Sequence, residues 1–149
     1  MLHLAATIRT TMSLEIIHRE HEGIEILDLK GDLTFGPEDL HFRNELAGLP
    51  LAGKILAALN LVDLRNLDTI GLGTLVFALE KLRRAGGNLA IFNMRPSHIE
   101  LVVEARLETT FEAYETEQDA IDSFFPERNV KRYDILAFVE AQQFTRSKS

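Results

Sequence analysis

The stretch that decides the fold is Leu59-Asn60-Leu61-Val62-Asp63-Leu64-Arg65-Asn66-Leu67-Asp68-Thr69-Ile70-Gly71-Leu72-Gly73. We expect an apolar strand to end in it near Asp63 and a helix to begin at Asp68 and Thr69. The first N–H groups of a helix have no partner within the helix, and the helix dipole favours negative charge at that end. A phosphate added to the Thr69 hydroxyl would therefore be stabilised locally. The alternative, compatible with the first, is that Asp68 and Thr69 only cap the helix.

The helix after Thr69 is expected to bury one apolar stripe, made of Leu72, Leu75, Val76, Leu79 and Leu82. It should end at Gly86-Gly87, because glycine suits a left-handed C-cap. Gly73 and Phe77 follow Thr69 at four-residue spacing, away from that stripe. They would give a partner a flat spot and an aromatic anchor. The alternative for Phe77 is a core position on the flank of the helix.

Strand and helix patterns alternate on both sides of this stretch. Strands are expected at 14–18, 24–30, 54–61, 88–93 and 111–114, and helices from Pro37, from Thr69, from Pro96 and over 116–125. The first two strands form a hairpin, and the apolar run 54–61 should be the central strand. Ile24 and Ile26 would face one side, and Leu27 and Leu29 the other. The pattern predicts an α/β fold with a mixed, mostly parallel β-sheet and helices packed mainly on one face.

Composition limits the function further. A chain of 149 residues with 46% hydrophobic and 26% charged residues fits one globular domain. Its net charge of -7 disfavours nucleic acid as a partner. Cysteine is absent, which excludes disulfides and thiol nucleophiles and fits a cytoplasmic location. The apolar runs, such as 55–59, are too short to insert into a membrane.

The two ends of the chain are expected to differ from the middle. Residues 1–12 would be a disordered N-terminal extension, 13–126 the folded domain, and 127–149 a helical C-terminal extension. Asp134 would cap a short helix with Ile135, Phe138, Val139 and Gln142 on one face. This helix either folds back onto the domain or serves as an arm that docks a partner or a second subunit.

No catalytic or metal-binding constellation is found in the sequence. His18 and His21 fit a solvated turn better than a metal site, and His98 is expected to be exposed at a helix start. Gly71-Leu72-Gly73 lacks the third glycine of a dinucleotide-binding motif, because Val76 stands there, and no glycine run leads into Gly-Lys-Ser/Thr. We therefore predict a protein that is not an enzyme and needs no metal or cofactor.

Residues 14–125 resemble the STAS domain of bacterial anti-sigma factor antagonists. Leu29-Lys30-Gly31-Asp32-Leu33 is similar to the L-x-G-E-L motif of that family. Residues 60–73 are similar to its N-L-x-x-L-x-x-x-D-S-S-G-L-G loop and helix. The likeness continues at Gly86-Gly87, Pro96, Leu107 and Phe111.

The resemblance implies which residues form the site. The serine phosphorylated in the family corresponds to Thr69, and the serine after it to Ile70. An aspartate that the family places near the phosphoacceptor corresponds to Thr34, which leaves Asp32 and Asp68 as the acidic neighbours. The partner-binding residues would be Asp32, Thr34, Asp68, Ile70, Gly71, Gly73 and Phe77.

The resemblance also implies a partner-switching regulator of sigma-factor-dependent transcription. The unphosphorylated chain would bind an anti-sigma factor with serine/threonine kinase activity and would be released on phosphorylation at Thr69. A PP2C-type phosphatase would reset it, and the chain would be a monomer or weak dimer. Two alternatives remain: a structural STAS subunit of a lipid-transport ABC system, and a stressosome-like scaffold.

Overall fold

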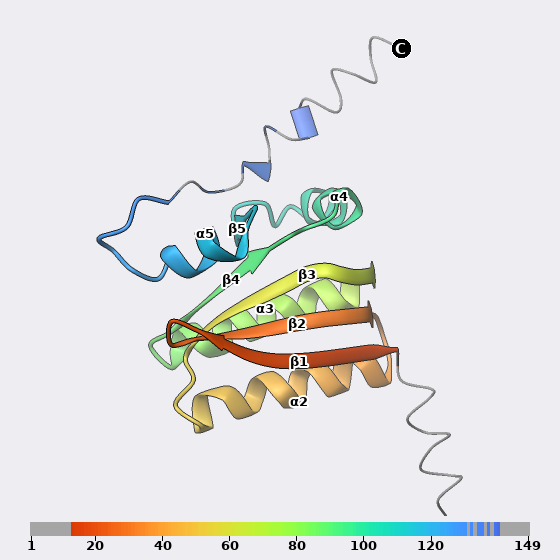
Figure 1. Ribbon diagram of the computed structural model, residues 1–149. Helices are drawn as coiled ribbons and strands as arrows, with labels where there is room; N and C mark the ends of the chain where they lie inside the picture. Colours follow the sequence, from red (N-terminus) through yellow and green to blue (C-terminus); the bar gives the residue numbers. More distant parts are fainter. Residues whose placement is uncertain (1–12, 131, 133, 136, 138, 141–149) are drawn as a thin grey trace, which may run out of the picture.

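The computed structural model describes residues 13–130, 132, 134, 135, 137, 139 and 140, and the expected extension 1–12 lies outside them. In the described chain a sheet of five strands has the order β1-β2-β3-β4-β5 (Figure 1). The elements are β1 (Leu14–His21), β2 (Ile24–Leu33), α2 (Pro37–Leu51), β3 (Leu56–Leu67), α3 (Thr69–Arg84), β4 (Asn88–Phe92), α4 (Pro96–Glu104), β5 (Glu112–Tyr114) and α5 (Glu117–Asp122).

The sheet is mixed and mostly parallel, as predicted. β1 and β2 form an antiparallel hairpin, whereas the pairs β2–β3, β3–β4 and β4–β5 are parallel. The hairpin turn uses left-handed backbone at Glu22 (φ 53) and Gly23 (φ 81). β3 is the central strand, which confirms the interpretation of the apolar run.

The helices pack mainly on one face of the sheet, as predicted (Figure 1). The larger core lies on that face, where Leu27 and Leu29 meet side chains of α2, α3 and α4, and it includes Phe42, Leu46, Leu72, Leu75, Leu79, Ile99 and Val102. The smaller core lies on the other face, where Ile24 and Ile26 share a cluster with Ala120 and Ile121 of α5. The predicted alternation of β2 is therefore confirmed.

β3 is longer than predicted, because it continues past the apolar run to Leu67. β4 pairs with it only as far as Asn60, while β2 stays paired through Leu33 and Leu67 after two shifts of register. In this second half only Leu61 and Leu64 are fully buried. A strand segment with one neighbouring strand and one buried face carries many polar residues. The continuous apolar pattern in the sequence therefore ends before the strand does.

A row of polar side chains crosses the face of the sheet that carries α5. Arg19 on β1 binds Asp28 on β2 at 2.6 Å, and Asp28 accepts a hydrogen bond from Asn60 on β3 at 2.8 Å. Asn93, after β4, donates to Asn60 at 3.0 Å. Burial opposes the charge on Asp28, but the bonds from Arg19 and Asn60 outweigh it and lower the pKa of this carboxyl. Arg19 also binds Glu117 at 2.6 Å, which ties the hairpin to α5.

Part of the C-terminal extension is described, and it lies against the domain. Asp134 accepts a hydrogen bond from the N–H of Ala137 at 2.9 Å, as expected of a helix cap. Ile135 is buried in the larger core and Val139 packs on it. These contacts favour the folded-back alternative over a free arm, while Phe138 and Gln142 lie outside the described residues.

The expectation that His98 is exposed is wrong, because His98 is 1% exposed. Its Nδ1 accepts a hydrogen bond from the Arg95 N–H at 3.1 Å, which caps the start of α4. Its Nε2 faces the backbone of Leu64 without a hydrogen bond of normal geometry. Burial, followed by the nearby charge of Arg95, lowers the pKa of His98. The ring therefore joins α4 to the second half of β3.

The connection from α3 to β4 depends on close backbone packing. Gly86 has φ 88, so it provides the predicted left-handed end of the helix. Gly87 has another role, because a Cβ there would lie 1.7 Å from the Ile55 carbonyl oxygen. Only glycine lets this loop lie against the chain that enters β3.

The variant Gly87→Ala is expected to lower the free energy of unfolding by about 1–3 kcal/mol, because the backbone must move to admit the methyl group. Urea unfolding measures the change. Gly48→Ala is the matched control, since the space around Gly48 in α2 is open. The control should gain about 0.5–1 kcal/mol from helix propensity. Equal effects at the two sites would refute the close-packing argument.

Stability should fall as the pH drops below the ordinary His98 pKa of 6.5. The unfolded chain then binds a proton that the folded chain, with its lowered pKa, does not bind, so acid favours unfolding. At higher pH both states are neutral at this residue and the effect is absent. His98→Asn keeps an acceptor for the Arg95 N–H but should show a smaller loss. Urea unfolding at several pH values compares the two proteins, and identical pH profiles would contradict the prediction.

Candidate functional site

Asp68 connects the start of α3 to the loop that follows β2. One carboxylate oxygen accepts a hydrogen bond from the Gly71 N–H at 2.7 Å and caps the helix. The other accepts from the Phe35 N–H at 2.9 Å. One side chain thus fixes both the first turn of α3 and the segment between β2 and α2.

Thr69 is the first residue of α3, and its side chain is exposed to solvent. The N–H groups of Gly71 and Leu72 are bonded to Asp68, through its carboxylate and its carbonyl oxygen respectively. In the described part of the chain, the N–H groups of Thr69 and Ile70 have no hydrogen-bond partner. The end of the helix therefore offers two open donors beside an accessible hydroxyl, which is a favourable place for a negative group.

Gly71 is predicted to be a partner-binding residue, but the structure shows that it is buried. A Cβ at this position would lie 2.0 Å from the Leu33 carbonyl oxygen. Gly71 therefore lets the first turn of α3 pack on the end of β2, and it contributes no exposed side chain. Gly73 is exposed with open space around it, so its proposed role as a flat spot stays a prediction.

Asp32 lies at the end of β2 beside this helix, Thr34 directly follows the strand, and both are partly exposed. Asp32 accepts a hydrogen bond from the Asn66 amide at 2.9 Å, which joins the ends of β2 and β3. The Arg65 guanidinium lies 4.0 Å from the same carboxylate oxygen. The structure thus brings Asp32, Thr34, Asp68, Thr69 and Ile70 to the same end of the sheet.

Phe77 lies two helical turns beyond Thr69 and is half-buried. The Arg43 guanidinium lies 4.9 Å from the centre of its ring and the Lys81 ammonium 5.6 Å. Arg43 also binds Asp39, which in turn accepts a hydrogen bond from Thr74. Phe77 therefore lies beside α2 without entering either hydrophobic core, and its role as a partner anchor stays a prediction.

Exposed apolar side chains flank Thr69, and sequence reasoning missed one of them. Phe35 is 78% exposed although its backbone is held by Asp68, and Ile70 is 44% exposed. Leu40, near the start of α2, is also exposed. The sequence could have indicated that Phe35 is exposed, because it lies in the loop between a strand end and Gly36-Pro37. An aromatic side chain in such a loop has no core to pack into.

The described residues include no group of three or more His, Cys, Asp or Glu side chains arranged to hold a metal ion. Among them, no helix is both long enough and apolar enough to span a bilayer. The site consists of an accessible hydroxyl, open backbone donors and exposed apolar side chains. Such a surface is suited to binding another protein and to modification.

Comparison with known proteins is consistent with this description. The STAS domain family model matches residues 15–120. No curated protein is similar enough in sequence to count as a relative.

Solved structures share the fold at low identity. An anti-sigma factor antagonist from Mycobacterium paratuberculosis is 19% identical, with 75% of this chain and 94% of that chain covered and a TM-score of 0.67. The anti-sigma factor antagonist SpoIIAA in its unphosphorylated form is 18% identical, with 77% and 100% covered and a TM-score of 0.65. The Bacillus cell fate determinant SpoIIAA in the phosphorylated form is 18% identical, with 74% and 97% covered and a TM-score of 0.56. At such identities the likeness is evidence for the fold alone.

Replacing Asp68 tests whether one carboxylate holds both parts of the site. Asp68→Ala should lower the free energy of unfolding by about 1–2 kcal/mol through the lost cap. Asp68→Asn keeps one acceptor oxygen and should retain much of the cap, but its amide cannot accept the second bond. Hydrogen exchange of the Phe35 N–H should therefore accelerate in both variants. Unchanged protection of Phe35 in Asp68→Ala would show that another group holds the loop.

Proposed function

Because the chain belongs to the STAS domain family, we propose that it is an anti-sigma factor antagonist controlled by phosphorylation of Thr69. Unphosphorylated, it binds an anti-sigma factor that has serine/threonine kinase activity, and it thereby frees a sigma factor. That kinase phosphorylates Thr69 and the complex separates. A PP2C-type phosphatase restores the first state. In this scheme ATP and catalysis belong to the partners, and the chain itself acts by binding.

The observation that carries this proposal is the exposed hydroxyl of Thr69 at the first residue of α3. A kinase needs such access, and the neighbouring apolar groups, Phe35 and Ile70, give a partner a surface to cover. Asp68 supports the same use, because its two oxygens are bonded to backbone N–H groups and hold this surface in shape.

The physical basis of the switch is an asymmetry between the free chain and the complex. A phosphate adds about −1.5 to −2 charges and three acceptor oxygens. In the free chain these face water and the open N–H groups of Thr69 and Ile70. In the complex the partner must desolvate the charge or oppose it with its own. The free-energy cost of the phosphate therefore appears in the complex and weakens binding.

The two acidic neighbours of Thr69 already accept hydrogen bonds. Asp68 accepts one N–H on each carboxylate oxygen, and Asp32 accepts the Asn66 amide on one of its oxygens. Thr34 stands where the family often has an aspartate. In our proposal the kinase provides the base. The methyl group of threonine also restricts rotation of the acceptor, so Thr69→Ser should be phosphorylated at least as fast as the parent chain.

Substitutions at Thr69 should separate binding from release. Thr69→Ala should bind the anti-sigma kinase and resist phosphorylation with ATP, whereas Thr69→Glu should bind about tenfold or more weakly because of its charge. Calorimetry with the purified kinase measures affinity, and mass spectrometry locates the phosphate. Thr109→Glu, at an exposed threonine after α4, is the matched control and should bind like the parent.

Equal affinity of Thr69→Ala and Thr69→Glu would contradict the proposal, and so would a phosphate found elsewhere in the chain. Capture of a transporter permease or its ATPase in place of a kinase would favour the structural-subunit alternative. Capture within a large assembly of other STAS proteins would favour the scaffold alternative.

A further inference from the structure

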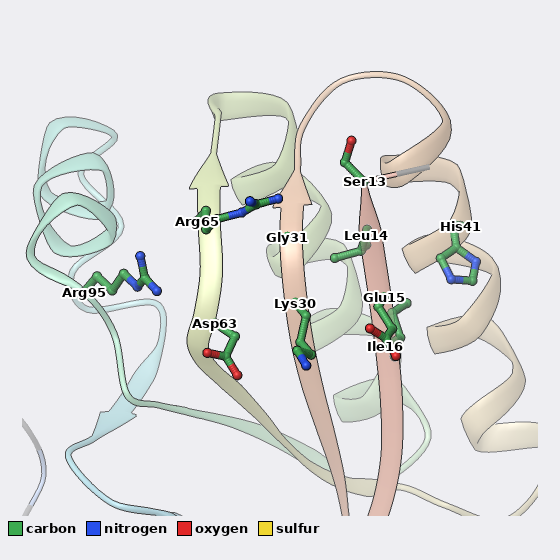
Figure 2. A pocket seen from close by; sticks show the side chains of 10 residues that line it. All are labelled: Ser13, Leu14, Glu15, Ile16, Lys30, Gly31, His41, Asp63, Arg65 and Arg95. Carbon is green, nitrogen blue, oxygen red and sulfur yellow. The ribbon is translucent and has the colours of Figure 1, made fainter. Parts of the chain in front are cut away.

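A hollow of about 810 Å³ lies over the start of β1 and the second halves of β2 and β3. Five charged side chains line it: Glu15, Lys30, Asp63, Arg65 and Arg95. They come from three strands and from the loop before α4 (Figure 2). The polar row of Arg19, Asp28, Asn60 and Asn93 separates this open part of the sheet from the core beneath α5. We call this space the basic hollow.

Arg95 is held in a fixed position at the edge of the basic hollow. Its Nε and one terminal nitrogen donate to the Val62 carbonyl oxygen at 3.0 and 2.7 Å. A guanidinium has five N–H donors, so three remain for another acceptor. The fork is already ordered before a ligand arrives, and little side-chain entropy is lost on binding.

Arg65 is the other guanidinium at the basic hollow. Its side chain is 66% exposed, and its closest carboxylate oxygen, on Asp32, is 4.0 Å away. This distance is at the limit of an ion pair and too long for a hydrogen bond. Figure 2 shows Arg95 reaching from its loop toward β3, and Arg65 reaching from β3 toward Gly31 on β2. Two such groups suit a phosphate, whose oxygens accept paired N–H bonds.

Lys30 contributes little net positive charge to the basic hollow. It lies directly opposite Glu15 on β1 and Asp63 on β3, so two carboxylates flank one ammonium across the sheet. The arginines are therefore the cations left for an anion. The carboxylates, in turn, are acceptors for hydroxyl groups of a ligand.

We propose that the basic hollow binds a small phosphorylated compound that carries hydroxyl groups, of the sugar-phosphate or polyol-phosphate class. Arg65 and Arg95 take the phosphate, and Asp63 accepts hydrogen bonds from the hydroxyls. Glu15 and Asp63 restrict the site to one compact anion, because a chain of phosphates would be repelled by them and by a protein of net charge -7. This binding requires neither a partner nor phosphorylation of Thr69, so its test is independent of the proposed function.

Titration of the isotope-labelled chain with glycerol 3-phosphate, inorganic phosphate and glycerol, each followed by amide NMR shifts, tests the proposal. With both phosphates we expect saturable shifts at Lys30, Asp63, Arg65 and Arg95. Glycerol 3-phosphate should bind more tightly than inorganic phosphate, and glycerol should not bind. Arg65→Gln and Arg95→Gln should each weaken binding roughly tenfold. Arg84→Gln, an exposed arginine at the other end of α3, removes the same charge and should leave affinity unchanged.

A second variant separates the two parts of the ligand. Asp63→Asn should abolish the preference for glycerol 3-phosphate over inorganic phosphate without weakening the latter. If Arg95→Gln unfolds because the Val62 bonds are lost, Arg65→Gln alone decides the result. The proposal is overturned if neither phosphate gives saturable shifts, or if Arg84→Gln weakens binding as much as Arg65→Gln. It is also overturned if single-stranded DNA or phosphatidic acid vesicles bind these residues while glycerol 3-phosphate does not.

Discussion

The two hydrogen bonds accepted by the Asp68 carboxylate hold together the end of the molecule that carries the candidate site. One orders the first turn of α3 and the other fixes the loop that carries Phe35. The same turn rests on the backbone of Leu33, because Gly71 has no side chain to separate them. Strand end, loop and helix are therefore joined to one another by direct contacts. A hydroxyl on this unit has a defined position even though it is exposed.

Much of the fold could be predicted from periodicity alone. The leucine stripe of α3 and the apolar run of β3 mark elements that are covered by neighbours, and burial leaves a strong pattern in sequence. The second half of β3 could not be recognised in this way, because only Leu61 and Leu64 are fully buried there. His98 was misjudged for a related reason. Its burial depends on α4 lying over Leu64, a tertiary contact that no local pattern records.

The candidate site also contains some residues that the sequence predicts and others that it does not. Asp68, Thr69 and Ile70 are adjacent in the chain, so a motif was enough to find them. Phe35 joins them only through a hydrogen bond between residues 33 positions apart. The basic hollow is even harder to predict from the sequence, because its charged groups come from three strands and a loop. Such sites arise where the register of a sheet brings distant side chains into one row.

The exposure of Thr69 has a consequence for the lifetime of the protein. Its side chain belongs to neither hydrophobic core, so a negative charge placed on it would disturb no packing, and the start of α3 would favour it. A charge at this position would therefore not unfold the chain for proteases that recognise unfolded proteins. If Thr69 is modified as we propose, the same folded molecule survives the change and can be used again.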